Sequence, residues 1–193
     1  MEKKIVFFDL ETNGLTPDWS VLAIAAIRCL FTGNTLERDG DPFIRYYFRK
    51  PGEPVNSQSI KINGLTDAVI TDKRKTADYG LYFRNDQQSF RDYCRDTAHY
   101  VGHNISFDRQ FIDFTPRHTF CTMYENTDIV RIMGKNGHYK WPKLDEAARF
   151  YGITTDAGSL HDCSYDVFLT YRIFDRMLFF DRTRDRVLKF LMR

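Results

Sequence analysis

Asp9 and Glu11 are two carboxylates at the end of a predicted buried strand. Asp9 follows four apolar residues, Ile5 to Phe8, and Glu11 lies two positions further on. Side chains two apart in a strand point to the same face, so we expect the two carboxylates to lie together. Like charges held beside a buried strand raise each other's pKa, and a bound divalent cation compensates for the repulsion. Taken alone, this pair is also typical of ordinary surface charge.

A second cluster, residues 103–108, combines polar side chains with an aromatic stripe. Asn104 and Asp108 are four positions apart, so in a helix they share one face. Phe107, Phe111 and Phe114 form the neighbouring face, and we expect a helix over this stretch that ends before a proline. The stripe then holds Asp108 at the edge of the core, although an aspartate on a helix surface is the simpler interpretation of this residue alone.

The third cluster, residues 161–166, leads into the last long helix. His161 and Asp166 cannot point the same way if both are helical, because five residues turn through about 500°. They converge if Asp162 caps the helix and His161 lies in the preceding loop. A histidine at such a junction is also common as a structural hydrogen-bonding residue.

The three clusters carry more weight together than singly, because their carboxylates all stand at the ends of predicted elements. Four carboxylates and one histidine form a donor set rich in oxygen and free of thiols. Such a set matches hard cations such as Mg²⁺ or Mn²⁺ rather than zinc.

Composition excludes several classes of protein. The 193 residues are 42% hydrophobic and 28% charged, which excludes a largely disordered chain. Lys and Arg number 28 against 26 Asp and Glu, so a polycationic binder is excluded and any nucleic-acid contact must be local. No segment approaches the roughly 20 apolar residues of a membrane span, and no signal peptide is evident. We therefore expect a cytoplasmic protein without membrane contact, and its four scattered cysteines should be reduced and mostly buried.

The elements that must position these clusters follow an α/β pattern. Residues 5–8, 21–30 and 43–48 predict three consecutive strands in a meander, and 100–101 and 119–122 predict two more. Helices are expected from Asn85 or Asp86 onward, over the 107–114 stripe, up to Gly152, and over 167–180. This order favours a mixed five-stranded sheet flanked by helices. We assign residues 1–180 to one domain and 181–193 to a basic C-terminal helix or tail.

Residues 8–15, 103–108 and 161–166 resemble the three ordered motifs of the DnaQ-like 3′–5′ exonucleases, which have a ribonuclease H-like fold. They read Phe-Asp-Leu-Glu-Thr-Asn-Gly-Leu, His-Asn-Ile-Ser-Phe-Asp and His-Asp-Cys-Ser-Tyr-Asp. The histidine five positions before the last aspartate is typical of the DEDDh branch. Residues 62–66 resemble a further family motif, and 120–123 and 140–144 resemble bacterial polymerase III proofreading subunits.

The resemblance implies a two-metal mechanism with Mg²⁺, for which Mn²⁺ would substitute. The metal-binding and catalytic carboxylates that it implies are Asp9, Glu11, Asp108 and Asp166. His161 would be the general base. The substrate-binding residues that it implies are Thr12, Gly14, Leu15, His103, Asn104 and Phe107. Ala23 stands where many members carry a glutamate, and residues 79–84 look like an insertion.

The leading hypothesis is an exonuclease that removes nucleoside 5′-monophosphates from single-stranded 3′ ends of DNA, either free-standing or as a partner of a DNA polymerase. The first alternative keeps the chemistry but takes RNA, as oligoribonuclease and tRNA-trimming relatives do. The second is an inactive nucleic-acid-binding module. It predicts a lost carboxylate, whereas all four are present. The basic runs 73–75 and 135–143 are candidate rims for strand binding.

Overall fold

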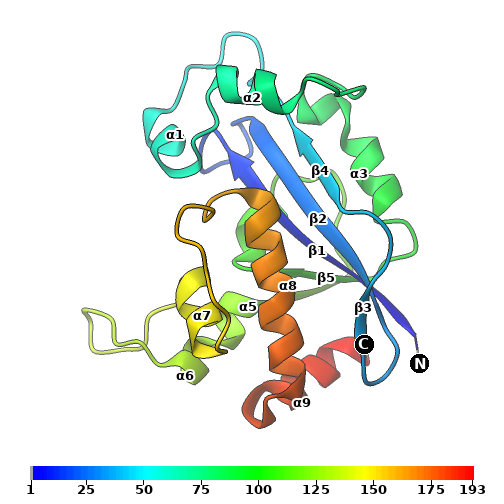
Figure 1. Ribbon diagram of the computed structural model, residues 1–193, viewed down its shortest axis with the longest axis vertical. Helices are drawn as coiled ribbons and strands as arrows, with labels where there is room; N and C mark the ends of the chain where they lie inside the picture. The colour runs from blue at the N-terminus through cyan, green and yellow to red at the C-terminus, as the bar shows by residue number, and fades with distance from the viewer. Residues whose placement is uncertain (1) are drawn as a thin grey trace.

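The computed structural model describes residues 2–193, and its centre is a mixed β-sheet (Figure 1). The strands are β1 (Lys3–Thr12), β2 (Val21–Phe31), β3 (Leu36–Arg38), β4 (Phe43–Tyr46), β5 (His99–Gly102) and β6 (His118–Cys121). The spatial order is β3-β2-β1-β5-β6, with β4 also paired to β2. The β1–β2 pair is antiparallel, whereas β5 runs parallel to both β1 and β6.

The sheet of residues 2–193 has six strands, one more than predicted. The additional strand, β3, pairs with one end of β2, and β4 pairs with the other end of the same edge. Three residues are too few to show the alternation by which a strand is recognised in a sequence. The predicted mixed α/β sheet flanked by helices is otherwise confirmed.

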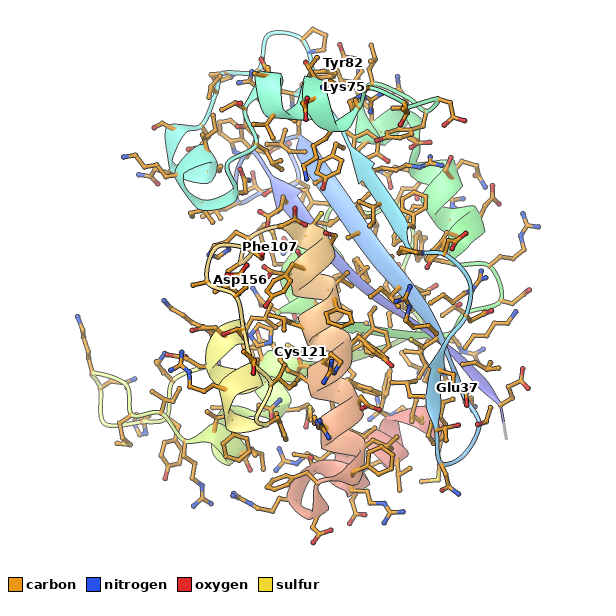
Figure 2. The ribbon with its side chains drawn as sticks, in the orientation of Figure 1. Glu37, Lys75, Tyr82, Phe107, Cys121 and Asp156 are labelled. Carbon is orange, nitrogen blue, oxygen red and sulfur yellow. The ribbon has the colours of Figure 1, made fainter. Side chains whose placement is uncertain are left out.

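Two apolar cores cover the two faces of the sheet. Successive residues of β1 point alternately into the two cores. Phe7 packs edge-on against Phe174 of α8 (Cys163–Phe179), with ring centroids 5.3 Å apart. Phe8 points the other way, 5.7 Å from Phe90 of α3 (Gln87–Tyr93). In Figure 1, α8 crosses the sheet diagonally, and side chains fill the space between them (Figure 2). Because β1 lies between these layers, its polar residues are drawn into a largely buried environment.

The remaining helices are short. They are α1 (Ser57–Asn63), α2 (Asp67–Lys73), the 3₁₀ turn η1 (Phe83–Asn85), α4 (Ile105–Asp108), α5 (Thr122–Glu125), α6 (Thr127–Val130), α7 (Leu144–Phe150) and α9 (Asp181–Leu191). The prediction of a helix along the 107–114 stripe is wrong beyond Asp108. Phe111 and Phe114 pack against the core from turns, and the Gln87 side chain satisfies backbone groups there. Its Oε1 accepts from the Asp113 N–H at 2.7 Å.

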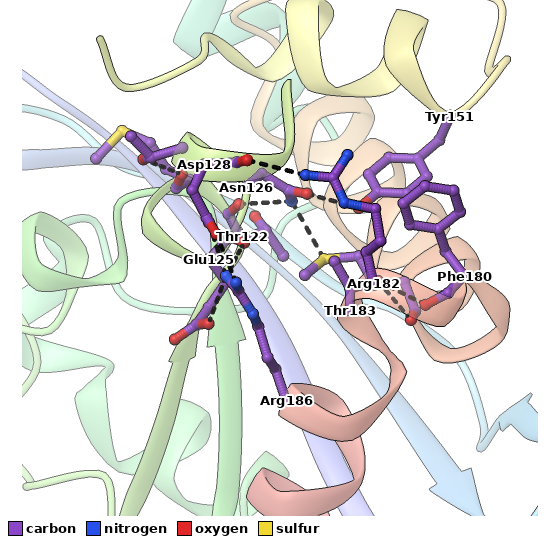
Figure 3. A network of polar contacts seen from close by, with 12 residues as sticks. Thr122, Glu125, Asn126, Asp128, Tyr151, Phe180, Arg182, Thr183 and Arg186 are labelled. Carbon is purple, nitrogen blue, oxygen red and sulfur yellow. Dashed lines mark hydrogen bonds and ion pairs between the residues drawn. The ribbon is translucent and has the colours of Figure 1, made fainter. Parts of the chain in front are cut away.

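The C-terminal segment forms α9, which packs on α8 through Thr183, Val187 and Phe190. Arg186 links α9 to α6, because its guanidinium donates to the Asp128 carboxylate at 2.6 and 2.8 Å (Figure 3). The division of the chain at residue 180 stays a prediction.

Asn126 links α5, α8 and the residue that follows α7 (Figure 3). Its amide nitrogen donates to the Thr122 carbonyl at 2.7 Å and contacts the Met177 sulfur at 3.2 Å. Its oxygen accepts from the Tyr151 hydroxyl at 2.6 Å. Asn126 is fully buried, so these contacts supply the partners that water would otherwise provide.

The four cysteines are buried and free, as predicted. None of the helices described for residues 2–193 combines the length and the apolar character that a membrane crossing requires.

Candidate active site

Asp9 and Glu11 lie within β1 rather than after it, because the strand stays paired with β2 up to Thr12. Their cross-strand partners are Ala25 and Ala23, whose small side chains leave space above the sheet. Both carboxylates share the face of β1 that carries Phe7, and this face is covered by α8. The predicted pairing of the two carboxylates on one face is confirmed.

Asp108 reaches the same strand from the opposite layer. Its Oδ1 accepts a hydrogen bond from the Leu10 N–H at 3.1 Å, across 98 positions of sequence. The side chain is 3% exposed. Burial raises the pKa of Asp108 to about 7, although the bond from Leu10 acts in the opposite direction.

Asp166 and His161 stand at the start of α8. Asp162 caps this helix, accepting from the backbone N–H groups of Ser164 and Tyr165, so the predicted cap is confirmed. His161 lies in the preceding loop with φ 69°, and its N–H donates to Asp166 Oδ2 at 3.2 Å. The imidazole itself is exposed to solvent.

Three side chains come close enough to share one ion: Glu11, His161 and Asp166 each offer a ligand atom, and these atoms lie within 4.8 Å of one another. Asp9 and Asp108 lie near enough to this group for the charges of the carboxylates to act on one another. The pKa of Asp9 is raised well above its ordinary value by burial and then by the charges of Asp108, Glu11 and Asp166.

Burial is also the largest cause of the raised pKa values of Glu11 and Asp166. Burial and then Asp166 raise the pKa of Glu11 to about 8, against a lowering hydrogen bond from Asn63. Burial raises that of Asp166 to about 7. Asp166 Oδ1 is buried and has no hydrogen-bond partner within residues 2–193.

This donor set fits a hard divalent cation. It consists of carboxylate oxygens that repel one another, an unpartnered oxygen and one imidazole. Cys163 lies beside the cluster, and burial raises the pKa of its thiol, which disfavours a thiolate there.

The predicted substrate residues after Glu11 form a tight turn. The Thr12 hydroxyl donates to the Gly14 carbonyl at 2.6 Å. Gly14 is packed under the Trp19 ring so closely that a Cβ there would lie 2.4 Å from the indole. Leu15 projects from this turn and is 80% exposed. The turn that follows Glu11 in the chain therefore presents one apolar side chain to solvent.

The predicted residues of the second cluster are arranged differently. Asn104 has φ 74° and precedes α4, so it does not share a helix face with Asp108, and that prediction is wrong. Phe107 packs on Phe111 with ring centroids 5.1 Å apart. Both His103 ring nitrogens are engaged at 3.0 Å, by the Thr122 hydroxyl and the Pro142 carbonyl. The substrate roles of these residues stay predictions.

The structure adds to this site Asn63, which was not predicted as a site residue, and Lys73, which was named only as part of a candidate rim for strand binding. A cavity of about 210 Å³ next to Glu11 is bordered by Ala23, Asn63 and Lys73. Asn63 donates to the Thr12 carbonyl at 3.3 Å, and the Lys73 ammonium lies 3.6 Å from the Asp162 carboxylate. The signals in the sequence were Asn63 inside the 62–66 motif, Lys73 in a basic run, and the alanine at position 23.

Comparison with known proteins places the chain in a family. The model of the RNase_T exonuclease family matches residues 6–174. The chain therefore belongs to this exonuclease family, and the resemblance to DnaQ-like exonucleases of the DEDDh branch is confirmed.

Individual relatives agree with this class. The chain is 25% identical over 192 residues to DNA polymerase III subunit epsilon of Buchnera aphidicola, covering 89% of this chain and 71% of that protein. It is 30% identical over 131 residues to the PolC-type DNA polymerase III of Streptococcus pyogenes serotype M2, covering 68% of this chain. The chain spans only 7% of that PolC-type protein.

Solved structures share the fold. Exonuclease X in complex with 5′ overhanging duplex DNA has a TM-score of 0.60 at 19% identity, covering 95% of this chain and 99% of the other. E. coli exonuclease I in complex with a dT13 oligonucleotide has a TM-score of 0.71 at 16% identity, covering 98% and 43%. The sheet and its helical layers are thus those of exonuclease folds.

Proposed function

We propose that the protein is a metal-dependent 3′–5′ exonuclease that removes nucleoside 5′-monophosphates from single-stranded DNA ends. The observation that carries the proposal is the convergence of four carboxylates and His161 from three distant segments of an exonuclease-family chain. The raised pKa values of the four carboxyls mark a site where negative charge is concentrated in a largely buried place, which is typical of catalytic centres.

The residues that would hold two Mg²⁺ ions are Asp9, Glu11, Asp108 and Asp166, and Mn²⁺ would substitute. Asp9 would be a ligand among the other three carboxylates, because the charges of Asp108, Glu11 and Asp166 all act on it. Asp108 would act through water, since its Oδ1 already accepts from Leu10. When bound, the ions stabilise the attacking and departing oxygens of an in-line displacement.

His161 would accept the proton of the attacking water. Its backbone is held by the bond to Asp166, while its imidazole is exposed and within reach of the carboxylates. An imidazole nitrogen can accept a proton from water and release it again, which suits this task. Leu15, exposed on the turn that follows Glu11 in the chain, would pack on the terminal nucleotide and so hold the scissile phosphate in place.

DNA is favoured over RNA because the sequence relatives are DNA polymerase III proteins. An RNA substrate is the alternative, since the choice depends on contacts at the 2′ position. Association with a DNA polymerase and a cytoplasmic location stay predictions.

A time course on matched 5′-labelled single-stranded DNA and RNA, with Mg²⁺, Mn²⁺ or EDTA, tests the proposal. We expect a metal-dependent ladder that shortens from the 3′ end, faster on DNA. Asp166→Asn should abolish the ladder, whereas Asp185→Asn, an exposed aspartate on α9, should not. The absence of a ladder on both strands with both metals would refute the activity, and a faster RNA ladder would correct the substrate.

A further inference from the structure

Residues 131–143, hereafter the basic loop, connect α6 to α7 and carry an unusual charge. They include four cations and no acidic residue, in a chain whose 28 Lys and Arg are nearly balanced by 26 Asp and Glu. Lys140 is neutralised by Glu146, with its ammonium 2.6 Å from the carboxylate. Arg131, Lys135 and Lys143 are exposed and form no ion pair within residues 2–193. The loop is therefore a local positive surface.

The same loop presents aromatic side chains to solvent. Trp141 is 61% exposed and Tyr139 is 44% exposed. Trp141 rests edge-on against Tyr124 of α5, with ring centroids 5.1 Å apart, and the Arg131 guanidinium lies 5.9 Å from the Tyr139 ring. Large apolar rings set among unpaired cations form the combination that binds unpaired bases and phosphates together.

The basic loop has a defined shape. Met133 and Tyr139 form a β-bridge, and the Lys140 N–H donates to the Ile132 carbonyl at 2.8 Å. In Figure 1 the loop extends away from the body of the molecule beside α6 and α7, and Figure 2 shows its side chains reaching into solvent. An ordered loop loses less conformational entropy on binding a ligand than a flexible one does.

One end of the basic loop is fastened to the segment that carries Asp108. The Pro142 carbonyl accepts a hydrogen bond from His103 Nε2 at 3.0 Å. A carbonyl only accepts, so Nε2 carries the proton, and burial lowers the pKa of His103 to about 4, which keeps the ring neutral. His103 therefore joins one end of the basic loop to the segment that carries Asp108.

We infer that the basic loop binds the single-stranded part of the substrate upstream of the 3′ end. Bases would stack on Trp141 and Tyr139, while Lys135, Lys143 and Arg131 would face phosphates. A protein partner is the less favoured occupant, because exposed cations without ion-pair partners within residues 2–193, set beside exposed aromatic rings, complement phosphates and unpaired bases. This inference rests on the proposed exonuclease function, since it assigns the site that holds that enzyme's substrate.

Equilibrium binding without turnover tests the inference separately from catalysis. The affinity for a fluorescent single-stranded DNA of about 20 nucleotides, longer than a site of ~4–16 nucleotides, is measured by anisotropy in EDTA over a range of salt. Trp141→Ala should weaken binding about 10-fold through lost stacking. The pair Lys135→Gln and Lys143→Gln should reduce the slope of log K against log salt by about 1.4, or ~0.7 for each lost phosphate contact on a single strand.

A charge-matched control is available on α9, where Arg184 and Lys189 are exposed and have no ion pair within residues 2–193. The pair Arg184→Gln and Lys189→Gln removes the same charge and should leave the salt slope close to that of the wild type. Hydrolysis of a dinucleotide, too short to reach the basic loop, is followed in parallel. The loop variants should lose more activity on the long strand than on the dinucleotide.

Three results would overturn the inference. One is unchanged affinity in both loop variants, which would leave the loop as a protein-contact surface. Another is an equal change of salt slope in the control pair. The third is an equal loss on the dinucleotide. If the wild type binds the strand through the loop but cuts no strand, the binding site stands and the exonuclease activity fails.

Discussion

Replacing Asp166 by asparagine should stabilise the metal-free protein while it abolishes exonuclease activity. The wild-type carboxyl is 8% exposed, lies near Asp9 and Glu11, and has a pKa raised from 3.8 to about 7. A carboxyl whose pKa is raised on folding binds its proton more tightly in the folded state. Its ionisation therefore costs stability as pH rises above 3.8, and the loss is complete above about 7.

The size of the effect follows from the shift. About 3 pKa units correspond to about 4 kcal/mol at pH ~8, the upper limit for the isolated group. Asparagine removes the charge but keeps a buried polar group, so we expect about half, or ~2 kcal/mol. Its oxygen can still accept from the His161 N–H. For a chain of this length, ~2 kcal/mol raises Tm by about 4–8 °C.

Thermal unfolding in EDTA at about pH 8 and about pH 4 measures this effect. The gain in Tm should appear at the higher pH and vanish at the lower, where the wild-type carboxyl is protonated in the folded state. Mg²⁺ at 100 times its Kd should then stabilise the folded wild type by about 2.7 kcal/mol and so raise its Tm. The same Mg²⁺ concentration should leave the Tm of the variant unchanged.

Asp162→Asn is the matched control, because opposing contributions leave the pKa of Asp162 lowered. Burial acts to raise it, but hydrogen bonds from Ser164 and the charge of Lys73 prevail. This variant keeps a good helix cap and should gain no stability at about pH 8. The reasoning would be refuted if Asp166→Asn were no more stable than the wild type at about pH 8, or gained equally at both pH values.

Three further substitutions test other parts of the structure. His161→Ala should lower kcat about 10²–10⁴-fold while oligonucleotide affinity in EDTA stays close to wild type, and unchanged turnover would exclude a general-base role. Gly14→Ala should lower the free energy of unfolding by about 1–3 kcal/mol, because its Cβ would meet the Trp19 ring at 2.4 Å. A double-mutant cycle measured by thermal unfolding should show a smaller cost when Trp19 is also replaced by alanine. Asn126→Ala should cost about 3 kcal/mol and lower Tm by about 6–12 °C, since it leaves the Thr122 carbonyl and the Tyr151 hydroxyl without their buried partner; a shift within error would contradict that network.

Local patterns in the sequence predicted the features that depend on near neighbours. The alternation along β1 placed Asp9 and Glu11 on one face, and the residues before α8 indicated Asp162 as its cap. Both follow from backbone geometry over a few residues, which the residue types express directly.

Features that depend on packing were missed or mispredicted. The 107–114 stripe has helical spacing, but Phe114 packs from a turn, with ring centroids 5.9 Å from Phe90 and 5.8 Å from Tyr100. Gln87 supplies a partner for the backbone there, so a helix is not required. Asn104 adopts a left-handed conformation, which spacing alone does not reveal.

The sequence by itself determined the family, the class of fold and the identity of the chemical groups, because ordered motifs and short-range periodicity are local properties. The tertiary structure alone decided how those groups act on one another. The placement of β5 beside β1 brings Asp108 onto the Leu10 N–H, and α8 brings Asp166 over the same strand. Burial raises the pKa values of these carboxyls, and the charges of Asp108, Glu11 and Asp166 raise that of Asp9 further. Both effects arise only when segments distant in sequence are packed together.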